Sequence, residues 1–122
     1  MISGVFAEGY ATVPITFRLR NQPDFSIKFV IDTGFTDYLC LPPEAVNVLG
    51  LPFLYDLAAN LANNSNVILP VHEGTILWQG KEQKVRVLAT GRKPLLGTAL
   101  LDRQQLTIHF TEGGFVNIKT IE

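Results

Sequence analysis

The sequence predicts a mainly β protein, a strand-rich barrel or sandwich with one or two short helices. Short runs of β-branched and aromatic residues recur along the chain, each ended by Gly, Asn, Asp or Pro, as is typical of strands joined by turns. Helix signals are scarce and do not alternate with strands, which argues against an α/β fold. The 122 residues, 47% of them apolar, suit a single domain over residues 1–122 with a core of its own.

The expected strands follow one another along the whole chain. The first two flank Glu8-Gly9, a natural hairpin turn, and the third follows the turn residues Asn21 to Asp24. That third run, Phe25 to Ile31, ends on apolar residues and predicts a buried strand that stops at Asp32-Thr33-Gly34. Turns are expected at residues 63–65, 79–80, 90–91 and 112–114. The expected strands cover residues 2–7, 10–19, 25–31, 35–41, 51–61, 67–78, 84–90, 106–110 and 115–121.

Two short helices interrupt this series of strands. The main one is expected over PPEAVNVLG, residues 42–50. Pro43 suits the first turn of a helix, Glu44 complements the N-terminal end of the dipole, and Gly50 can end the helix. A second short helix is expected over Thr98 to Arg103.

Charge and cysteine content narrow the function classes. Ten Lys and Arg against eleven Asp and Glu leave a net charge of -1. The sequence has no run of basic residues of the kind that binds phosphates, which argues against nucleic acid as a partner. The single cysteine, Cys40, excludes an internal disulfide and a multi-cysteine metal site. The first ten residues do not match a signal peptide, and no apolar run is long enough for a membrane helix. We therefore expect a soluble, cytoplasmic protein.

Asp32 is the residue that points most directly to chemistry. It follows the apolar run Phe29 to Ile31, where a carboxylate is costly unless it is hydrogen-bonded or paired. Thr33 adds a hydroxyl, and Gly34 permits a tight turn and a close backbone approach. A carboxylate held in this way suits acid–base work on water. The alternative is a structural turn, in which the Asp side chain bonds the amide two residues on.

The chain resembles the retropepsin-like aspartic proteases, the single-lobe family that includes the retroviral proteases. The likeness rests on three segments in the same order and spacing as in that family. The first is FVIDTGFTDYLCLP at residues 29–42, the second is PLLG at 94–97 with ALL at 99–101, and the third is LTIHF at 106–110. The resemblance extends over about residues 2–121 and implies a closed, β-barrel-like acid protease lobe.

The resemblance also implies an aspartic endopeptidase whose site is completed by a second copy of the chain. Aspartic protease chemistry needs two carboxylates that share one proton, and of five Asp only Asp32 lies in Asp-Thr-Gly. One motif implies a homodimer in which a two-fold axis pairs the two copies of Asp32. Thr33 would bond to the other subunit, and Gly34 would let the two loops approach. The segments Ile2 to Phe6 and Phe115 to Ile121 would pair across the axis, and no cofactor or metal is implied.

Two features depart from the family pattern. The family usually has Ala or Ser after the Gly, but here Phe35 follows, and it offers no hydroxyl to the carboxylate. The substrate-covering flap of the family corresponds to Leu61 to Val67, with a turn at Asn63, Asn64 and Ser65 that contains no Gly. Both departures favour the alternative function, a non-catalytic dimerisation or peptide-binding module on the same fold.

The remaining candidates are weaker. A phospho-acceptor role for Asp32 would call for alternating βα units and further acidic Mg²⁺ ligands, and the sequence shows neither. Cys40 lies in an apolar run and is expected to be a small core residue rather than a nucleophile. His72 and His109 lack the spacing of a metal-binding motif. The expected partners are therefore a second copy and a peptide or protein substrate, with no membrane.

Overall fold

The computed structural model describes residues 1–60 and 62–122. Over these residues the elements are β1 (Ile2–Ala7), β2 (Tyr10–Phe17), β3 (Phe25–Ile31), β4 (Leu39–Leu41), α1 (Pro43–Leu49), β5 (Phe53–Asn60), β6 (Asn66–Trp78), β7 (Lys81–Ala89), β8 (Leu95–Leu96), β9 (Gln104–Ile108) and β10 (Gly114–Thr120). The alternation expected of a half-buried strand is clearest in β2, where every second residue is buried. The mainly β class is thereby confirmed.

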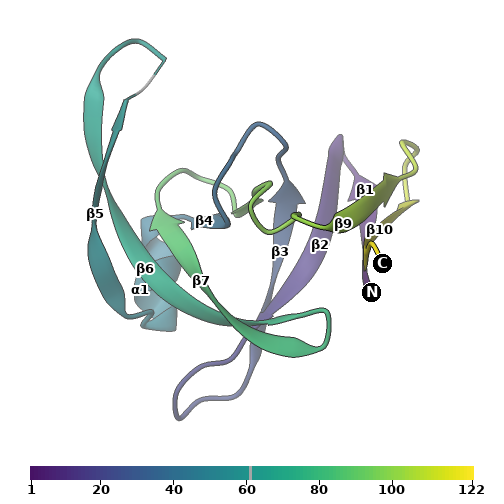
Figure 1. Ribbon diagram of the computed structural model, residues 1–122, viewed down its shortest axis with the longest axis horizontal. Helices are drawn as coiled ribbons and strands as arrows, with labels where there is room; N and C mark the ends of the chain where they lie inside the picture. Colours follow the sequence, from purple (N-terminus) through teal and green to yellow (C-terminus); the bar gives the residue numbers. More distant parts are fainter. Residues whose placement is uncertain (61) are drawn as a thin grey trace.

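The strands join into one sheet that curls into a ring (Figure 1). The order is β5-β6-β7-β4-β8-β3-β2-β1-β10-β9 in the described chain, and β6 pairs a second time, with β2. This second pairing joins Phe17 to Ile76 and closes the ring through β2, β3, β8, β4, β7 and β6. Because a single bridge makes the closure, the ring is looser than a fully hydrogen-bonded barrel.

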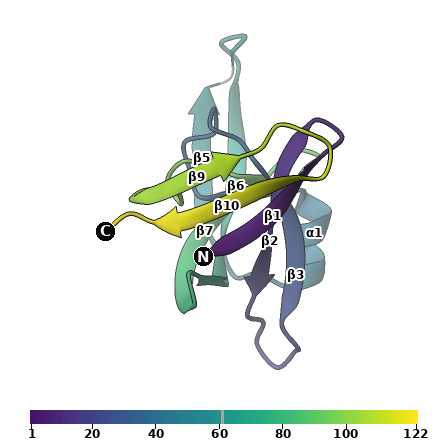
Figure 2. The same cartoon turned by 90° about the vertical axis from the view of Figure 1, so that its right-hand side faces the viewer.

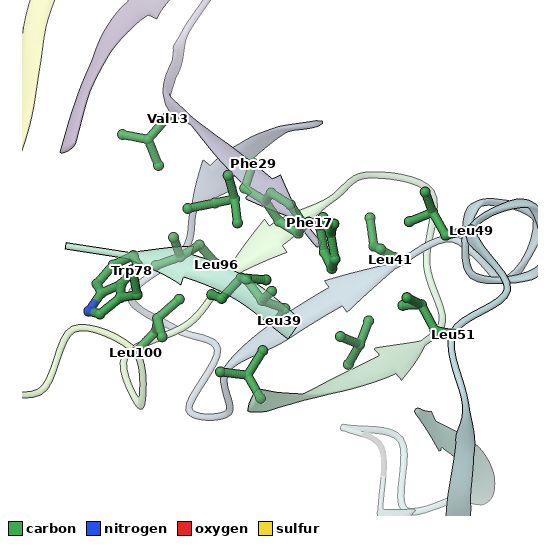
Figure 3. Close-up of a cluster of buried hydrophobic side chains, with 14 of the residues drawn as sticks. Val13, Phe17, Phe29, Leu39, Leu41, Leu49, Leu51, Trp78, Leu96 and Leu100 are labelled. Atoms are coloured by element: carbon green, nitrogen blue, oxygen red, sulfur yellow. The ribbon is translucent and has the colours of Figure 1, made fainter. Parts of the chain in front are cut away.

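Large apolar side chains fill the ring (Figure 3). They come from strands far apart in the sequence: Phe17 from β2, Phe29 from β3, Leu39 and Leu41 from β4, and Leu96 from β8, all fully buried. The rings of Phe17 and Phe29 lie 6.0 Å apart, centroid to centroid. Each such side chain contributes about 1.5–3 kcal/mol by leaving water. This core holds β3, β4 and β8 together and so fixes the ends of these strands.

The helix α1 confirms the first of the two expected helices. Pro lies in its first turn, and Gly50 ends it in the left-handed conformation, with φ at 65°, a geometry that favours glycine. The buried residues Val46 and Leu49 attach the helix to the core. No helix in the described part of the chain is long and apolar enough to cross a bilayer.

The expectation of a second helix over Thr98 to Arg103 is wrong. The segment is a series of turns, in which the Leu100 N–H donates to the Gly97 carbonyl at 3.2 Å and the Leu101 N–H to that of Thr98 at 3.0 Å. These bonds span three residues rather than the four of an α-helix. Arg103 then adopts a φ of 59° and directs the chain into β9 before a helix can form.

The expected strand over residues 35–41 is only partly present. Its last residues form β4, but residues 35–38 are a loop. The Phe35 N–H closes a turn onto the Asp32 carbonyl at 3.1 Å, and the carbonyls of Phe35 and Tyr38 accept bonds from the loop that follows β8. The segment therefore pairs with another loop rather than with a strand. The short strand β8, which the sequence did not predict as a strand, forms because it pairs with both β3 and β4.

The terminal strands also differ from the expectation that they pair with a second subunit. In this chain β1 pairs antiparallel with β10, from Ile2 opposite Ile118 to Phe6 opposite Gly114. On its other side β10 pairs with β9, and Figure 2 shows β10 between β9 and β1. The segment at residues 104–120 forms a hairpin that places β10 between β1 and β9, the last strand of the sheet. The backbone groups of the two segments thus hydrogen-bond to each other within one chain.

Candidate active site

Asp32 lies directly after β3, at an end of the ring. Its N–H donates to the Leu96 carbonyl at 3.0 Å, which fixes the backbone beside β8. Its carboxylate Oδ1 accepts the Gly34 N–H at 2.9 Å, which is the turn bond expected of an Asp in this position. The residue as a whole is half-buried. Because a carboxylate has about four lone-pair sites, this bond leaves capacity for a water molecule or a second carboxyl group.

The two motif segments named in the sequence meet at Gly97. Its N–H donates to the Tyr38 carbonyl at 2.9 Å, and the Thr98 N–H donates to the Phe35 carbonyl at 2.8 Å. A Cβ atom built on Gly97 would lie 2.2 Å from the Asp37 carbonyl oxygen, closer than any side chain permits. The loop after Asp32 can therefore rest on residue 97 only because that residue is glycine.

Thr33 and Gly34 form the exposed tip of the turn that follows Asp32. A Cβ atom on Gly34 would come 3.2 Å from Asp32 Oδ1, so any larger residue would crowd the carboxylate. Phe35 is half-buried, and its ring occupies the space beside Gly97 that a side chain there would need. Phe35 thus forms part of the support of the loop.

The described residues of the expected flap segment, 62–67, lie at the tip of a hairpin made by β5 and β6. It projects from the same end of the ring as the loop between β3 and β4 (Figures 1 and 2). At its exposed tip the Ser65 N–H and Oγ–H both donate to Asn63 Oδ1, at 3.0 and 2.6 Å. Asn64 has a φ of 66°, a left-handed conformation that Asn tolerates well. Leu61, the first residue of the expected flap segment, lies outside the described residues.

A polar contact that the sequence did not predict joins this hairpin to the loop after Asp32. Arg86 in β7 donates from Nη2 to Asp37 Oδ2 and from Nη1 to the Tyr55 hydroxyl, both at 2.8 Å. The hydrogen bond to Tyr55 and the attraction of Asp37 raise the pKa of Arg86 above its usual value. One signal was present in the sequence, since Arg86 is the only charged residue in the otherwise apolar run Val85 to Ala89.

The other candidate residues lie in structural roles. Cys40 is buried, and this burial raises the pKa of its thiol, which disfavours the thiolate that a nucleophile needs. The His72 ring Nδ1 lies 2.9 Å from the Leu51 carbonyl oxygen, and the His109 ring packs against Phe115. Within residues 1–60 and 62–122, no three His, Cys, Asp or Glu side chains are grouped so that they could hold a metal ion.

The fold and this site define a single-lobe, mainly β chain with one Asp-Thr-Gly turn supported by a glycine from a second loop. A crystal structure of a retropepsin-like aspartic protease from Rickettsia conorii has the same fold, with a TM-score of 0.58 and 21% sequence identity. The match covers 100% of this chain and 91% of that chain. No family profile and no curated protein match the sequence. The chain therefore has the fold of a retropepsin-like lobe.

Proposed function

We propose that the chain is the subunit of a homodimeric, cytoplasmic aspartic endopeptidase. The observation that carries this proposal is the position of Asp32, which is held at the end of β3 by Leu96 and Gly34 in a loop that rests on Gly97. The retropepsin-like fold supports it, since the solved structure with this fold is a retropepsin-like aspartic protease. In the proposed dimer each chain supplies one carboxylate, Asp32, and a two-fold axis brings the two copies together.

In this mechanism the two copies of Asp32 share one proton. The charged carboxylate takes a proton from a water molecule as that water attacks the scissile carbonyl, and the protonated one donates to the carbonyl oxygen. As the peptide bond breaks, the carboxyl group that took the proton from water passes it to the leaving amine, and the other carboxylate takes a proton back from the diol, so that the pair again shares one proton. The Gly34 N–H holds Asp32 Oδ1 throughout, so the carboxylate keeps its orientation. Thr33 stabilises the paired loops, and the hairpin tip at Asn63, Asn64 and Ser65 covers the substrate.

The second candidate is a peptide-binding or dimerisation module on the same fold. It is favoured by Phe35, which gives the carboxylate no hydroxyl, and by a hairpin tip that is fixed by the side chain of Asn63. In such a module Asp32 would serve only the turn that it makes with Gly34. The two candidates differ in one measurable property, the cleavage of peptides.

Cleavage of a broad peptide library is therefore the first expected result. Activity should fall on both sides of an acidic to near-neutral optimum, because the mechanism needs one charged and one neutral carboxyl group. A statine-type peptide that mimics the tetrahedral intermediate should bind better than its amide parent. Mass spectrometry of the peptide products across pH 3 to 8 measures the pH dependence of cleavage, and the same assay measures how strongly the statine-type peptide and its amide parent inhibit it. Cleavage that a chelator or thiol alkylation blocks would contradict the proposal.

A homodimer is the second expected result. Each chain carries a single Asp-Thr-Gly, so the shared-proton mechanism is available only when two copies associate. Sedimentation velocity at tens of micromolar protein should show a species of twice the 13.5 kDa chain mass. A chain that stays at 13.5 kDa while it cleaves peptides would rule out the symmetric pair of Asp32 residues.

A further inference from the structure

The contact of Arg86 with Asp37 and Tyr55 joins three elements that are distant in the sequence. Asp37 belongs to the loop that follows Asp32, Arg86 to β7, and Tyr55 to β5 near the base of the hairpin. The side chain of Asp37 is only 14% exposed, and its second oxygen, Oδ1, accepts the Tyr38 N–H at 2.8 Å. The carboxylate is therefore held from both sides.

We propose that Arg86 is a positioning residue that fixes the β5–β6 hairpin over the loop carrying Asp32. The inference rests on the proposed function, because it assigns the hairpin to the substrate. Through Tyr55 the guanidinium holds the hairpin, and through Asp37 it holds the loop that rests on Gly97. A displacement of either element would break one of two bonds of 2.8 Å.

The remaining ion pairs of the described chain do not connect functional elements in this way. Arg18 contacts Asp24 and Glu82, and all three side chains are about half exposed, so solvent and salt weaken these contacts. Lys84 lies 3.9 Å from Glu73 on the neighbouring strand. The pair of Arg86 with Asp37 is shorter and more buried at its acidic partner, as a positioning contact requires.

The face of the hairpin that carries Tyr55 is also the face that a substrate would meet. Tyr55 lies opposite Val71, and Leu57 and Ala59 follow on the same face of β5 because side chains alternate along a strand. Since the Tyr55 hydroxyl reaches toward the Asp32 loop through Arg86, this face is turned toward that loop. The position of the hairpin over the Asp32 loop therefore depends on the Tyr55 contact.

The chemistry of arginine suits this position better than that of lysine. A guanidinium is planar and presents donors from different nitrogens in a fixed geometry, so it can bond two partners at once. Here Nη1 serves Tyr55 and Nη2 serves Asp37. A lysine ammonium is a single point charge on a flexible stem and would keep at most the ion pair with Asp37. Arg86→Lys therefore tests the simultaneous contact of Arg86 with Asp37 and Tyr55, and Tyr55→Phe tests the contact with the hairpin alone.

The experiment compares Tyr55→Phe and Arg86→Lys with the wild-type protein and with Tyr10→Phe as the matched control. Tyr10 and Tyr55 are similarly exposed, at 42% and 40%. The control Tyr10→Phe and the test variant Tyr55→Phe each lose only a hydroxyl group. Amide hydrogen exchange by mass spectrometry should show about fivefold faster exchange in residues 53–60 and 66–72 of both test variants. Exchange in β2 and β3 of the test variants should stay unchanged, and so should exchange throughout the Tyr10→Phe variant.

Peptide kinetics supply a second readout. Because the hairpin holds the bound substrate, both test variants should raise KM about fivefold while kcat stays within about twofold. Unchanged exchange in the hairpin, or exchange that rises equally in all strands together with a lower Tm, would overturn the proposal. If the wild-type protein cleaves no peptide, the proposed function fails, and the exchange data still decide whether Arg86 positions the hairpin.

Discussion

Asp32→Asn is expected to abolish peptide cleavage while the fold survives. Asn has nearly the same shape, and its side-chain oxygen can still accept the Gly34 N–H that Asp32 Oδ1 accepts at 2.9 Å. In the proposed homodimer the substitution removes the ionisable carboxyl group from both subunits at once, so neither copy of residue 32 can exchange a proton with water. The proposed dimer should not melt lower, because two ionisable carboxyl groups no longer crowd the two-fold axis. Mass spectrometry of peptide products and a melting curve measure the two effects.

The control for this variant is Asp102→Asn, at an exposed aspartate outside the motif, which should retain full cleavage. Dimerisation is measured for all three proteins, so that a lost dimer is not mistaken for lost chemistry. If Asp32 serves only the turn, the wild-type protein is inert and Asp32→Asn costs about 1 kcal/mol of stability. Cleavage that persists in Asp32→Asn would remove this residue from the mechanism.

Gly97→Ala is expected to destabilise the protein more than any other glycine substitution at the site. The new Cβ atom would lie 2.2 Å from the Asp37 carbonyl and 2.7 Å from the Phe35 carbonyl, and both are backbone atoms that cannot move aside alone. Overpacking of this kind costs about 3 kcal/mol, which corresponds to a melting temperature lowered by about 10 °C. The loop after Asp32 must also shift, so cleavage should fall sharply.

Gly80→Ala separates this steric clash from a simple loss of glycine. Gly80 lies in the turn between β6 and β7 with a φ of 81°, and a Cβ atom there meets nothing within 4 Å. Its replacement should cost only about 1–2 kcal/mol, the price of a left-handed alanine, with cleavage unchanged. If Gly97→Ala melts at the wild-type temperature, the loop contact at Gly97 is not as tight as the geometry indicates.

Local sequence signals predicted those parts of the fold that depend on neighbouring residues. The runs of β1 and β3 were predicted with the bounds that the structure shows, because β-branched residues and turn residues act locally. Helix α1 was found through Pro43 and Gly50 for the same reason. The candidate carboxylate, Asp32, was recognisable because a charged residue after an apolar run is rare.

The parts that were missed depend on contacts across long stretches of sequence. Residues 35–38 do not continue a strand because their carbonyls bond to Gly97 and Thr98, about sixty residues away. The bridge of Arg86 to Asp37 spans 49 residues, and a single sequence does not indicate which residue at that separation Arg86 will contact. These tertiary contacts override local propensity at the candidate site, which is where such conflicts are expected.

The pairing of β1 with β10 inside one chain separates folding from association. Each chain completes its own terminal sheet, so the lobe closes with its own strands. On the proposed mechanism, however, each folded chain holds only half of the catalytic pair. Below the dissociation constant of the dimer, the cleavage rate then varies with the square of the protein concentration. The abundance of the protein would itself regulate proteolysis, with a reserve of folded, silent subunits at low expression.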